Sequence, residues 1–529
     1  MAIATPLKQP NPQENWDAIV VGSGMGGLTA AVLLARHAGR RVLVLERHYE
    51  AGGFTHTFHR PGYQWDVGLH YIGEMGDSSS PARRAFDHVT GGAVAWQPMP
   101  AIYDRFLIDG SRFEFASGRE AFREGLCEAF PSETAAIDRY LHAAHAANRW
   151  RGLYSAEKAL PAPLASLAGG AMRAPYLRWA RRTTREVLES LTANRELIGV
   201  LAAQWGDYGL PPAQSSFAIH ATIVEHYLNG AFYPVGGAAS IAAVMVPLIE
   251  NAGGSVVTSA EVAGIVVERS RAAGVRMSDG RHFRAPLVIS DAGAANTFER
   301  LLPPNLPVLD SLRADLRTLA PSTAHASLYI GLSQTDVALG LTGTNLWIYP
   351  SFDHDANVER FARDLDAPMP GVYISFPSAK DPDFQRRCPG HGTIEAITML
   401  PWQPFAAWAR TRWKRRGDEY ETLKNSIAAR LRAEVERQVP AVAPHIAHAE
   451  LSTPVTTRHF ANYQQGEIYG IAATPRRFLT RGLGARTPIL GLYLTGQDAI
   501  SLGIVGALFG GIVCASAALG KNLAGTVTH

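Results

Sequence analysis

A glycine-rich turn between two apolar runs constrains the fold more than any other feature of the chain. Residues 22–27 read Gly-Ser-Gly-Met-Gly-Gly and follow the run 16–21, which is typical of a buried parallel strand. The pattern of 28–36 favours a helix, and 41–45 predicts a second strand that ends at Glu46. This order of strand, glycine turn, helix, strand and acid predicts a Rossmann-like, dinucleotide-binding α/β unit.

Each part of this unit has a physical task. Gly22 allows the tight turn, Gly24 lets the backbone approach a pyrophosphate, and Gly27 lets the helix pack closely on the strand. The helix N-terminus offers free N–H groups and a positive dipole to phosphates. The Glu46 carboxylate is suited to accept hydrogen bonds from ribose hydroxyls. A glycine turn without a nucleotide is the alternative, and the elements in register around it argue against that alternative.

A second glycine pair identifies the kind of dinucleotide. Gly52 and Gly53 stand six and seven residues after Glu46, and Phe-Thr-His-Thr-Phe follows them at 54–58. An acid, five residues and Gly-Gly resemble the extended fingerprint of FAD-binding proteins in the amine oxidase and phytoene desaturase superfamily. In that group the Gly-Gly turn passes close to the flavin, so the resemblance implies FAD as the cofactor.

The C-terminal region carries a matching motif. The apolar run 491–495 leads into Gly496 and Asp498, and residues 499–520 then hold no charged side chain. Twenty-two uncharged residues are long enough to span a bilayer. Glycines recur along this segment, however, and the superfamily places a helix after such a strand against the flavin. We therefore expect a buried cofactor helix rather than a membrane span.

The middle of the chain resembles the same superfamily. Phe232-Tyr-Pro-Val-Gly-Gly-Ala238 precedes an apolar helical stretch at 240–251, and strand-like runs follow up to Ser290. We predict a discontinuous Rossmann-like FAD-binding domain from residues 14–77, 228–297 and 485–529. An interleaved α+β substrate-binding domain with a helical cap is expected from residues 78–227 and 298–484.

Residues 62–75, Gly-Tyr-Gln-Trp-Asp-Val-Gly-Leu-His-Tyr-Ile-Gly-Glu-Met, resemble the retinol saturase branch, which is related to carotenoid isomerases and phytoene desaturases. The resemblance implies hydride transfer at flavin N5 to or from carbon–carbon double bonds of a long apolar polyene or isoprenoid. Saturation, desaturation and cis–trans isomerisation all fit, and NAD(P)H is a candidate external reductant. Animal members carry an N-terminal membrane-targeting region that the first residues here do not resemble, so retinol itself is not the expected substrate.

The resemblance assigns candidate site residues. His70 is the first candidate for a proton donor or a substrate-orienting group, and Tyr71 is the second. In an extended run, Asp66 and His70 would face one side and Tyr71 the other. A buried structural histidine and a core tyrosine are the alternatives. Candidate substrate-pocket residues are His56, Tyr233, Tyr463 and Tyr469. Expected cofactor contacts are Gly22, Gly24, Gly26, Gly27, Glu46, Arg47, Gly52, Gly53, Phe54, Thr55, Val262, Gly496, Asp498 and Val505.

Net charge, cysteine content and the N-terminal residues limit the class of partner and the compartment. The net charge of +3 over 529 residues gives no argument for nucleic acid. Three well-separated cysteines form neither a disulfide framework nor a metal motif, and residues 1–15 lack a signal-peptide pattern, so a reducing cytoplasm is expected.

An apolar stretch at 160–172 precedes arginines interleaved with aromatic residues up to 191, which suggests peripheral membrane contact. A solvated helix packed on the substrate domain is the alternative, and 408–416 forms a second basic-aromatic cluster.

Other functions remain open on the sequence alone. A fatty-acyl desaturase or isomerase would need a similar apolar pocket. An amine oxidase would share the cofactor domain, although the His-Tyr-Ile-Gly stretch at 70–73 argues against it. A flavin- or lipid-binding protein without turnover would keep the same glycine motifs.

Overall fold

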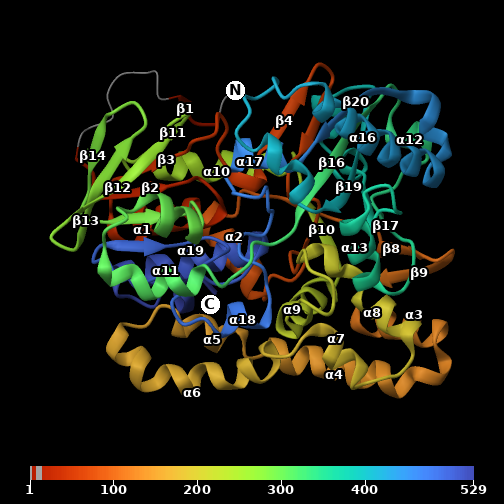
Figure 1. Ribbon diagram of the computed structural model, residues 1–529, viewed down its shortest axis with the longest axis horizontal. Coiled ribbons are helices and arrows are strands. Elements are labelled where there is room, and N and C mark those ends of the chain that lie inside the picture. Colours follow the sequence, from red (N-terminus) through yellow and green to blue (C-terminus); the bar gives the residue numbers. More distant parts are fainter. Residues whose placement is uncertain (1–2, 7–14, 529) are drawn as a thin grey trace.

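Two large β-sheets organise the part of the chain that the computed structural model describes, residues 3–6 and 15–528. Within this part, the first sheet has six parallel strands in the order β1-β11-β3-β2-β15-β21. The second has seven strands in the order β20-β16-β19-β18-β17-β8-β9. In Figure 1 the first sheet lies on the left and the second on the right. The predictions for residues 7–14 fall outside the described residues.

The first sheet confirms the Rossmann-like fold class. Its strands are short and, apart from the exposed β1, largely buried, as expected for a parallel sheet that helices cover on both faces. Strands predicted from three separate stretches pair side by side, whereas β1 was not predicted because two residues carry no periodic signal. The bounds are β1 Thr5–Pro6, β2 Ala18–Val21, β3 Val42–Leu45, β11 Ser255–Thr258, β15 Val288–Ser290 and β21 Leu492–Leu494. The exact domain boundaries stay a prediction.

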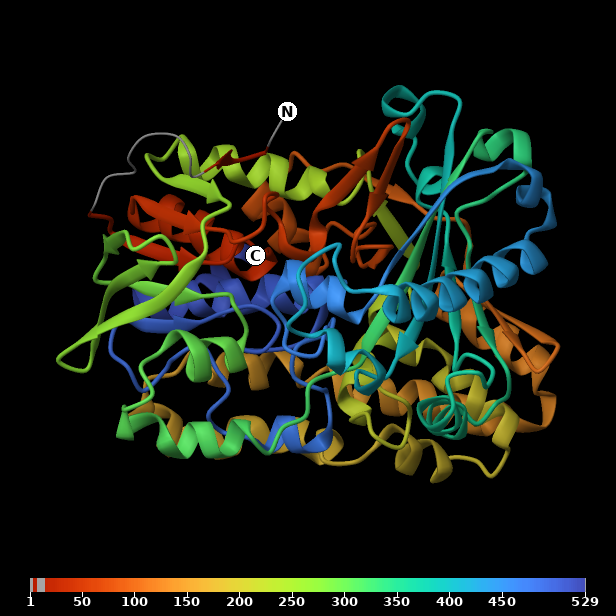
Figure 2. The same ribbon diagram turned by 45° about the horizontal axis from the view of Figure 1, so that its top comes forward.

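Two helices cross closely against this sheet. Helix α1 (Met25–Ala38) follows the glycine turn, and α19 (Gly503–Leu519) lies beside it in both views (Figures 1 and 2). A Cβ on Gly511 would lie 2.5 Å from Cβ of Thr29, so only glycine permits this approach. The uncharged C-terminal segment is therefore a packed helix, as predicted. Within the described residues, no helix is both long and apolar enough to cross a membrane.

The second sheet separates two environments. Side chains alternate along its strands, so that Leu346 and Ile374 face helix α16 (Asp418–Gln438), which crosses one side of the sheet in Figure 2. Trp347 and Tyr373 point to the opposite side. The bounds are β8 Ile102–Ile108, β9 Ser111–Ala116, β16 Ala324–Leu332, β17 Asn345–Tyr349, β18 Val372–Ser375, β19 Gly392–Leu400 and β20 Ile446–Ser452.

Helices between residues 119 and 227 lie along the lower edge of Figure 1, in the segment for which a helical cap was predicted, and are called the cap below. They are α3 Arg119–Ala129, α4 Thr134–Asn148, α5 Arg151–Glu157, α6 Ala162–Ala180, α7 Thr184–Glu189, α8 Arg195–Ala202 and α9 Phe217–Tyr227. The remaining α-helices of six or more residues in the described part of the chain are α2 Pro81–Thr90, α10 Ala239–Glu250, α11 Asp310–Leu316, α13 His354–Arg363, α17 Pro454–Ala461 and α20 Leu523–Thr528.

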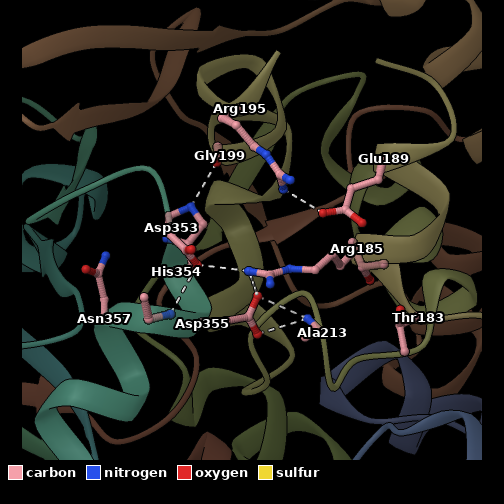
Figure 3. Close-up of polar contacts among 12 residues, drawn as sticks. Thr183, Arg185, Glu189, Arg195, Gly199, Ala213, Asp353, His354, Asp355 and Asn357 are labelled. Carbon is pink, nitrogen blue, oxygen red and sulfur yellow. Dashed lines mark hydrogen bonds and ion pairs between the residues drawn. The ribbon is translucent and has the colours of Figure 1, made fainter. Parts of the chain in front are cut away.

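An arginine clamp joins this cap to the second sheet domain (Figure 3). Arg185 of α7 lies 2.9 Å from Oδ1 of Asp353 and 2.7 Å from Oδ2 of Asp355, at the start of α13. Asp355 also accepts a hydrogen bond from the backbone N–H of Ala213, and His354 contacts the carbonyl of Gly199 at 2.8 Å. Arg185 belongs to the cluster that was predicted to contact a membrane; its side chain is 33% exposed, and these ion pairs join it to α13.

Three smaller sheets accompany the two large ones among the described residues. They are β4–β5 (Thr57–Arg60, Tyr63–Asp66), β6–β10–β7 (Ile72–Gly73, Ala231–Pro234, Trp96–Pro98) and β12–β13–β14 (Val262–Glu268, Arg271–Met277, His282–Arg284). Strand β5 ends at Asp66, and residues 67–71 are irregular. The prediction that His70 and Tyr71 point to opposite sides of one extended run is therefore wrong.

Candidate active site

A cavity of about 1330 Å³ runs from the glycine turn of the first sheet to the aromatic face of the second. This volume exceeds the usual range for one drug-sized ligand, about 300–1,000 Å³. The cavity therefore has room for a dinucleotide and for a second ligand at its apolar end. Gly24, Glu46 and Gly53 line one end, and His70, Trp347 and Tyr373 line the other.

The glycine turn is built for close approach of backbone. Gly22 has φ of +101°, which side chains on other residues would disfavour. A Cβ on Gly26 would lie 2.5 Å from the backbone nitrogen of Gly496, and one on Gly27 would collide with the carbonyl oxygen of Gly22. Gly27 accordingly serves helix packing and does not line the cavity.

Glu46 is held by donors from the turn and from its own loop. Its Oε2 accepts from the backbone N–H of Ser23 at 2.8 Å and from the Ser23 hydroxyl at 2.7 Å, and Oε1 accepts from the N–H of His48 at 2.7 Å. A carboxylate has about four acceptor sites. One acceptor site therefore remains for a ribose hydroxyl, while the three bonds fix the orientation of the side chain.

Asp291, at the end of β15, lies against the N-terminus of α1. A Cβ on Gly24 would lie 2.5 Å from its Oδ2, and the N–H groups of Gly27 and Gly24 face its carboxyl group. Burial raises the pKa of Asp291 to about 8, so its neutral form is favoured near pH 7. A neutral carboxyl group is compatible with a phosphate at this helix end, whereas a second negative charge would oppose one.

The Gly-Gly turn and the C-terminal motif meet between the two ends of the cavity. His56 Nδ1 lies 2.5 Å from the carbonyl of Gly53, so His56 braces the turn. Phe54 stacks on Tyr463 with ring centroids 6.1 Å apart. Gln497 donates to the Tyr463 hydroxyl at 2.8 Å. These contacts build a rigid aromatic wall beside the place where the two glycine motifs converge.

Asp498 joins three distant segments. Its Oδ1 accepts from the N–H of Ile471 at 2.9 Å, and its Oδ2 accepts from the N–H of Ala294 at 2.8 Å. The N-terminal turn of α19, including Val505, lines the cavity next to it. The positive end of this helix dipole is thus directed toward the cavity.

The apolar end of the cavity contains a buried histidine–acid pair. His70 Nδ1 lies 2.8 Å from Glu395 Oε2. Oε1 of Glu395 accepts from the N–H of Asp66, whose carboxyl group contacts the Tyr233 hydroxyl. Burial lowers the pKa of His70 to about 4 and raises that of Glu395 to about 8. At neutral pH the pair is therefore mainly a neutral imidazole beside a protonated carboxyl group.

Of the residues predicted from the sequence, Gly27 and Tyr233 do not line the cavity, and all the others do. The residues that line it are Gly22, Gly24, Gly26, Glu46, Arg47, Gly52, Gly53, Phe54, Thr55, His56, His70, Tyr71, Val262, Tyr463, Tyr469, Gly496, Asp498 and Val505. Tyr233 is buried behind His70 as the partner of Asp66.

Sequence reasoning missed four buried ionisable groups around the cavity, at Asp104, Asp207, Glu395 and Lys380. A signal existed for two of them. Glu395 is the one acid at 392–400, where the other eight residues are apolar or small, and Asp104 stands beside Arg105 in the otherwise apolar run 102–108. A charge in a buried strand is rare unless it is paired or functional.

The residues at the glycine-rich end fit a flavin dinucleotide. The turn leaves no room for a Cβ, Glu46 is oriented toward the cavity, and two helix N-termini converge on it. These are the features that a pyrophosphate and a ribose require.

Comparisons with known proteins agree with this geometry. Residues 20–89 match the family model of the NAD(P)-binding Rossmann-like domain. All-trans-retinol 13,14-reductase of Danio rerio is 38% identical, over 96% of this chain and 87% of that protein. Prolycopene isomerase 1 of the Oncidium hybrid cultivar is 27% identical, over 95% of this chain and 83% of that protein.

The fold also resembles that of solved amine oxidases. Wild-type putrescine oxidase bound to putrescine superimposes with a TM-score of 0.61 over 96% of this chain and 100% of that one, at 16% identity. At this identity the likeness shows the fold alone. Together with the Rossmann-like domain, it agrees with a dinucleotide-binding fold.

Proposed function

The chain belongs to the all-trans-retinol 13,14-reductase family, and on this basis we propose that it is a FAD-dependent oxidoreductase acting on polyene carbon–carbon double bonds. The observation that carries the proposal is the continuous cavity, which joins a dinucleotide cradle to an apolar, aromatic chamber. A long polyene or isoprenoid requires such a chamber, because apolar ligands bind in concave sites with few polar groups.

Saturation is the first direction to test. The chain is 38% identical to a protein named as a reductase and 27% identical to one named as an isomerase. FAD, when bound, supplies or accepts a hydride at N5. NAD(P)H is the external reductant that we propose for the saturation direction. The family's desaturase and isomerase chemistry would use the same chamber.

The chain's own residues hold the cofactor and exclude water. We propose that Glu46 binds the ribose and that the glycine turns leave space for the pyrophosphate. Phe54 and Tyr463 would line the site of the flavin ring system. Tyr71 stacks on Tyr227 with centroids 4.4 Å apart and helps close the apolar end. A dry site strengthens electrostatic interactions and suppresses side reactions.

His70 serves as a substrate-orienting group in this proposal. A neutral imidazole is a poor acid, and its lowered pKa keeps it neutral over the working pH range. Its position on the cavity wall, fixed by Glu395, suits it to contact a polar end of the substrate or to shape the chamber.

We also propose peripheral membrane contact through α6. The cavity reaches α5 at Gly152 and Ser155, and Tyr154 of α5 stacks on Tyr176 of α6 at 4.6 Å. The outer side of α6 exposes Leu164 and Leu167, which are 52% and 85% accessible. An apolar helix face beside the cavity would let a lipid-dissolved substrate enter without crossing water.

Co-sedimentation with vesicles tests the membrane contact. Replacing Leu164 and Leu167 with serine should abolish binding to anionic vesicles at physiological salt. The matched control is Leu153→Ser, at a leucine that is 37% accessible. Equal binding of both variants and the wild type, or no binding at all, would refute the contact.

The function itself is tested with anaerobically reduced enzyme, which is incubated with all-trans-retinol and with prolycopene and followed by mass spectrometry. A gain of two hydrogens with reoxidation of the flavin is the expected result. Unchanged mass with altered retention would indicate isomerisation. Hydrogen peroxide release with amines in air would indicate an amine oxidase, and a flavin that stays reduced with every polyene would indicate a carrier.

A further inference from the structure

A row of polar side chains crosses the cavity face of the second sheet. Asp104 of β8 pairs with Asn345 of β17 in register, and Ser375 of β18 pairs with Glu395 of β19. The next row toward the cavity is apolar and aromatic, with Trp347 opposite Tyr373. Polar side chains within a buried sheet face are costly unless they are hydrogen-bonded, so this row needs an explanation.

Lys380 supplies the positive charge of the row while it is protonated, because burial lowers its pKa to about 7. Its ammonium group donates to Asn345 Oδ1 at 2.5 Å, to Ser375 Oγ at 2.7 Å and to the carbonyl of His70 at 2.9 Å. All three protons are thereby used, and Lys380 does not line the cavity. Its role is electrostatic, and it stabilises one negative charge within the row.

Asp104 is the residue best placed to hold that negative charge. Its Oδ1 accepts from the amide of Asn345 and its Oδ2 from the amide of Gln204, each at 2.9 Å. The Tyr71 hydroxyl lies 3.1 Å from the same Oδ2. Burial raises the pKa of Asp104, and these donors oppose that rise, whereas the pKa of Asp207 is held well above its usual range, so Asp104 is the more readily ionised of the two acids.

Tyr71 links Asp104 to a second acid, Asp207. The Tyr71 hydroxyl lies 2.7 Å from Oδ2 of Asp207, and in the described part of the chain this is the one hydrogen bond of the Asp207 side chain. A hydroxyl group carries a single proton. If Tyr71 donates that proton to Asp104, then Asp207 must donate its own to Tyr71.

If Asp104 and Asp207 were both ionised, two carboxylates would lie on either side of the Tyr71 hydroxyl group in a low-dielectric site, where like charges oppose ionisation. Burial and the charge of Asp104 hold the pKa of Asp207 well above its usual range. Geometry and electrostatics therefore agree that the proton of this pair resides on Asp207.

Asp207 differs from the rest of the network in its access to the cavity. It lies in the 3₁₀ turn Ala203–Asp207, lines the cavity and is partly exposed to it, whereas Asp104 is fully buried. Aromatic side chains line the same cavity, among them Trp205, Tyr227 and Tyr349. A protonated carboxyl group thus faces an apolar chamber.

We propose that Asp207 is the proton donor to the double bond of the substrate. The inference rests on the proposed function in the saturation direction. One carbon of the double bond gains the hydride that dihydroflavin, the reductant, supplies. The π electron pair forms the second C–H bond with the proton of Asp207, and the flavin is left oxidised. Asp207 is left as a carboxylate and regains its proton from water.

Tyr71 and Asp104 are positioning residues in this scheme. The hydrogen bond from Asp207 to Tyr71 fixes the carboxyl group, and the ionised Asp104 disfavours premature loss of the proton. Lys380 and Asn345 hold Asp104 ionised.

The test compares wild type with Asp207→Asn and Asp207→Glu, with Asp336→Asn as the matched control. Asp336 is also a buried acid with a raised pKa, bonded to Ser378 Oγ at 2.7 Å, but it does not line the cavity. Flavin content and reduction by dithionite should be equal in all four proteins. Reoxidation by all-trans-retinol or prolycopene should slow by about 100-fold or more in Asp207→Asn and partly recover in Asp207→Glu.

Infrared spectroscopy gives a readout that does not depend on turnover. The protonated carboxyl band of wild type at pH 7 should lose one component in Asp207→Asn, and Asp336→Asn should keep that component. The rate of wild-type reoxidation should fall at alkaline pH, whereas the residual rate of Asp207→Asn should not.

Two results would overturn the proposal. They are an Asp207→Asn variant with the wild-type reoxidation rate, and a carboxyl spectrum that this substitution leaves unchanged. A wild-type enzyme that leaves both polyenes unaltered would instead overturn the proposed function, and the infrared comparison would still decide the protonation of Asp207.

Discussion

His70 Nδ1 lies 2.8 Å from Glu395 Oε2, so a loop that follows β5 is fixed to the middle of the second sheet. The contact joins residues 325 positions apart in the sequence, at the end of the cavity away from the glycine turns. Its electrostatic state, a neutral ring beside a neutral acid, allows the pair to stay buried without a net charge.

Replacing His70 with phenylalanine should leave the flavin bound and lower turnover by about tenfold or more. The ring volume is retained, whereas the contact with Glu395 is lost. The matched control is His325→Phe, because His325 is also a buried histidine that lines the same cavity. Flavin absorbance and steady-state rates measure both effects. Full activity in His70→Phe would show that His70 has no role in the reaction.

The buried Glu395 predicts a specific dependence of stability on pH. Its pKa rises from 4.5 to about 8, so the folded chain binds its proton more tightly than the unfolded chain does. The stabilisation is complete below pH 4.5 and is lost as the pH rises through about 8. Glu395→Gln stays neutral, so its melting temperature should fall less than that of the wild type between pH 6 and pH 9.

Two neighbouring groups are coupled to Glu395. Lys380 has a pKa lowered to about 7 and Asp66 has one raised to about 7, and a negative charge on Glu395 raises both, so the difference between the two proteins reports Glu395 together with these neighbours. Glu359→Gln, at an exposed ion pair with Arg363, serves as the control and should follow the wild type. Parallel melting curves for wild type and Glu395→Gln across this pH range would show that Glu395 is not held neutral.

The Rossmann-like sheet could be predicted because its signals are local. The turn at 22–27, the acid at 46 and the strand at 491–495 each carry their own pattern, and the family resemblance joined them. The buried helix at 503–519 followed from its glycines, which the crossing with α1 requires.

The polar row could not be predicted in the same way. It depends on the register between strands that are far apart in the chain, such as Asp104 opposite Asn345, and one sequence does not specify that register. Asp207 lies in a short 3₁₀ turn with no motif around it. His70 and Tyr71 were identified from a motif, but the irregular backbone after Asp66 places both on the cavity.

Glu46→Ala should weaken flavin retention. The substitution removes the acceptor for the ribose and leaves the donors of Ser23 and His48 unpaired. Hydrogen bonds to a charged group contribute about 1.5–3 kcal/mol, so the flavin dissociation constant should rise by roughly 10- to 100-fold. Glu261→Ala, an acid on the cavity rim that pairs with Arg47, is the control. Equal flavin content in both variants after gel filtration would contradict the assignment.

Two glycine-to-alanine substitutions in helices should have opposite effects on stability. Gly511→Ala places a Cβ 2.5 Å from Thr29 and 2.6 Å from the carbonyl of Gly26, so α19 must move away from α1. The cost should be about 1–3 kcal/mol, as for other overpacked cores. Gly170→Ala in α6 meets no atom within 4 Å and should stabilise the helix by about 1 kcal/mol. Urea unfolding measures the free energy of unfolding of both variants, and equal values would refute the tight crossing of α19 and α1.

Arg185→Ala should loosen the cap, because Arg185 holds both Asp353 and the largely buried Asp355 (Figure 3). Loss of a charged partner at Asp355 should cost about 1–3 kcal/mol. Arg195→Ala is the control from the same view, since its partner Glu189 is exposed and such pairs contribute at most about 1 kcal/mol. The melting temperature should fall clearly for Arg185→Ala and little for Arg195→Ala. Equal shifts would mean that the clamp does not join the cap to α13.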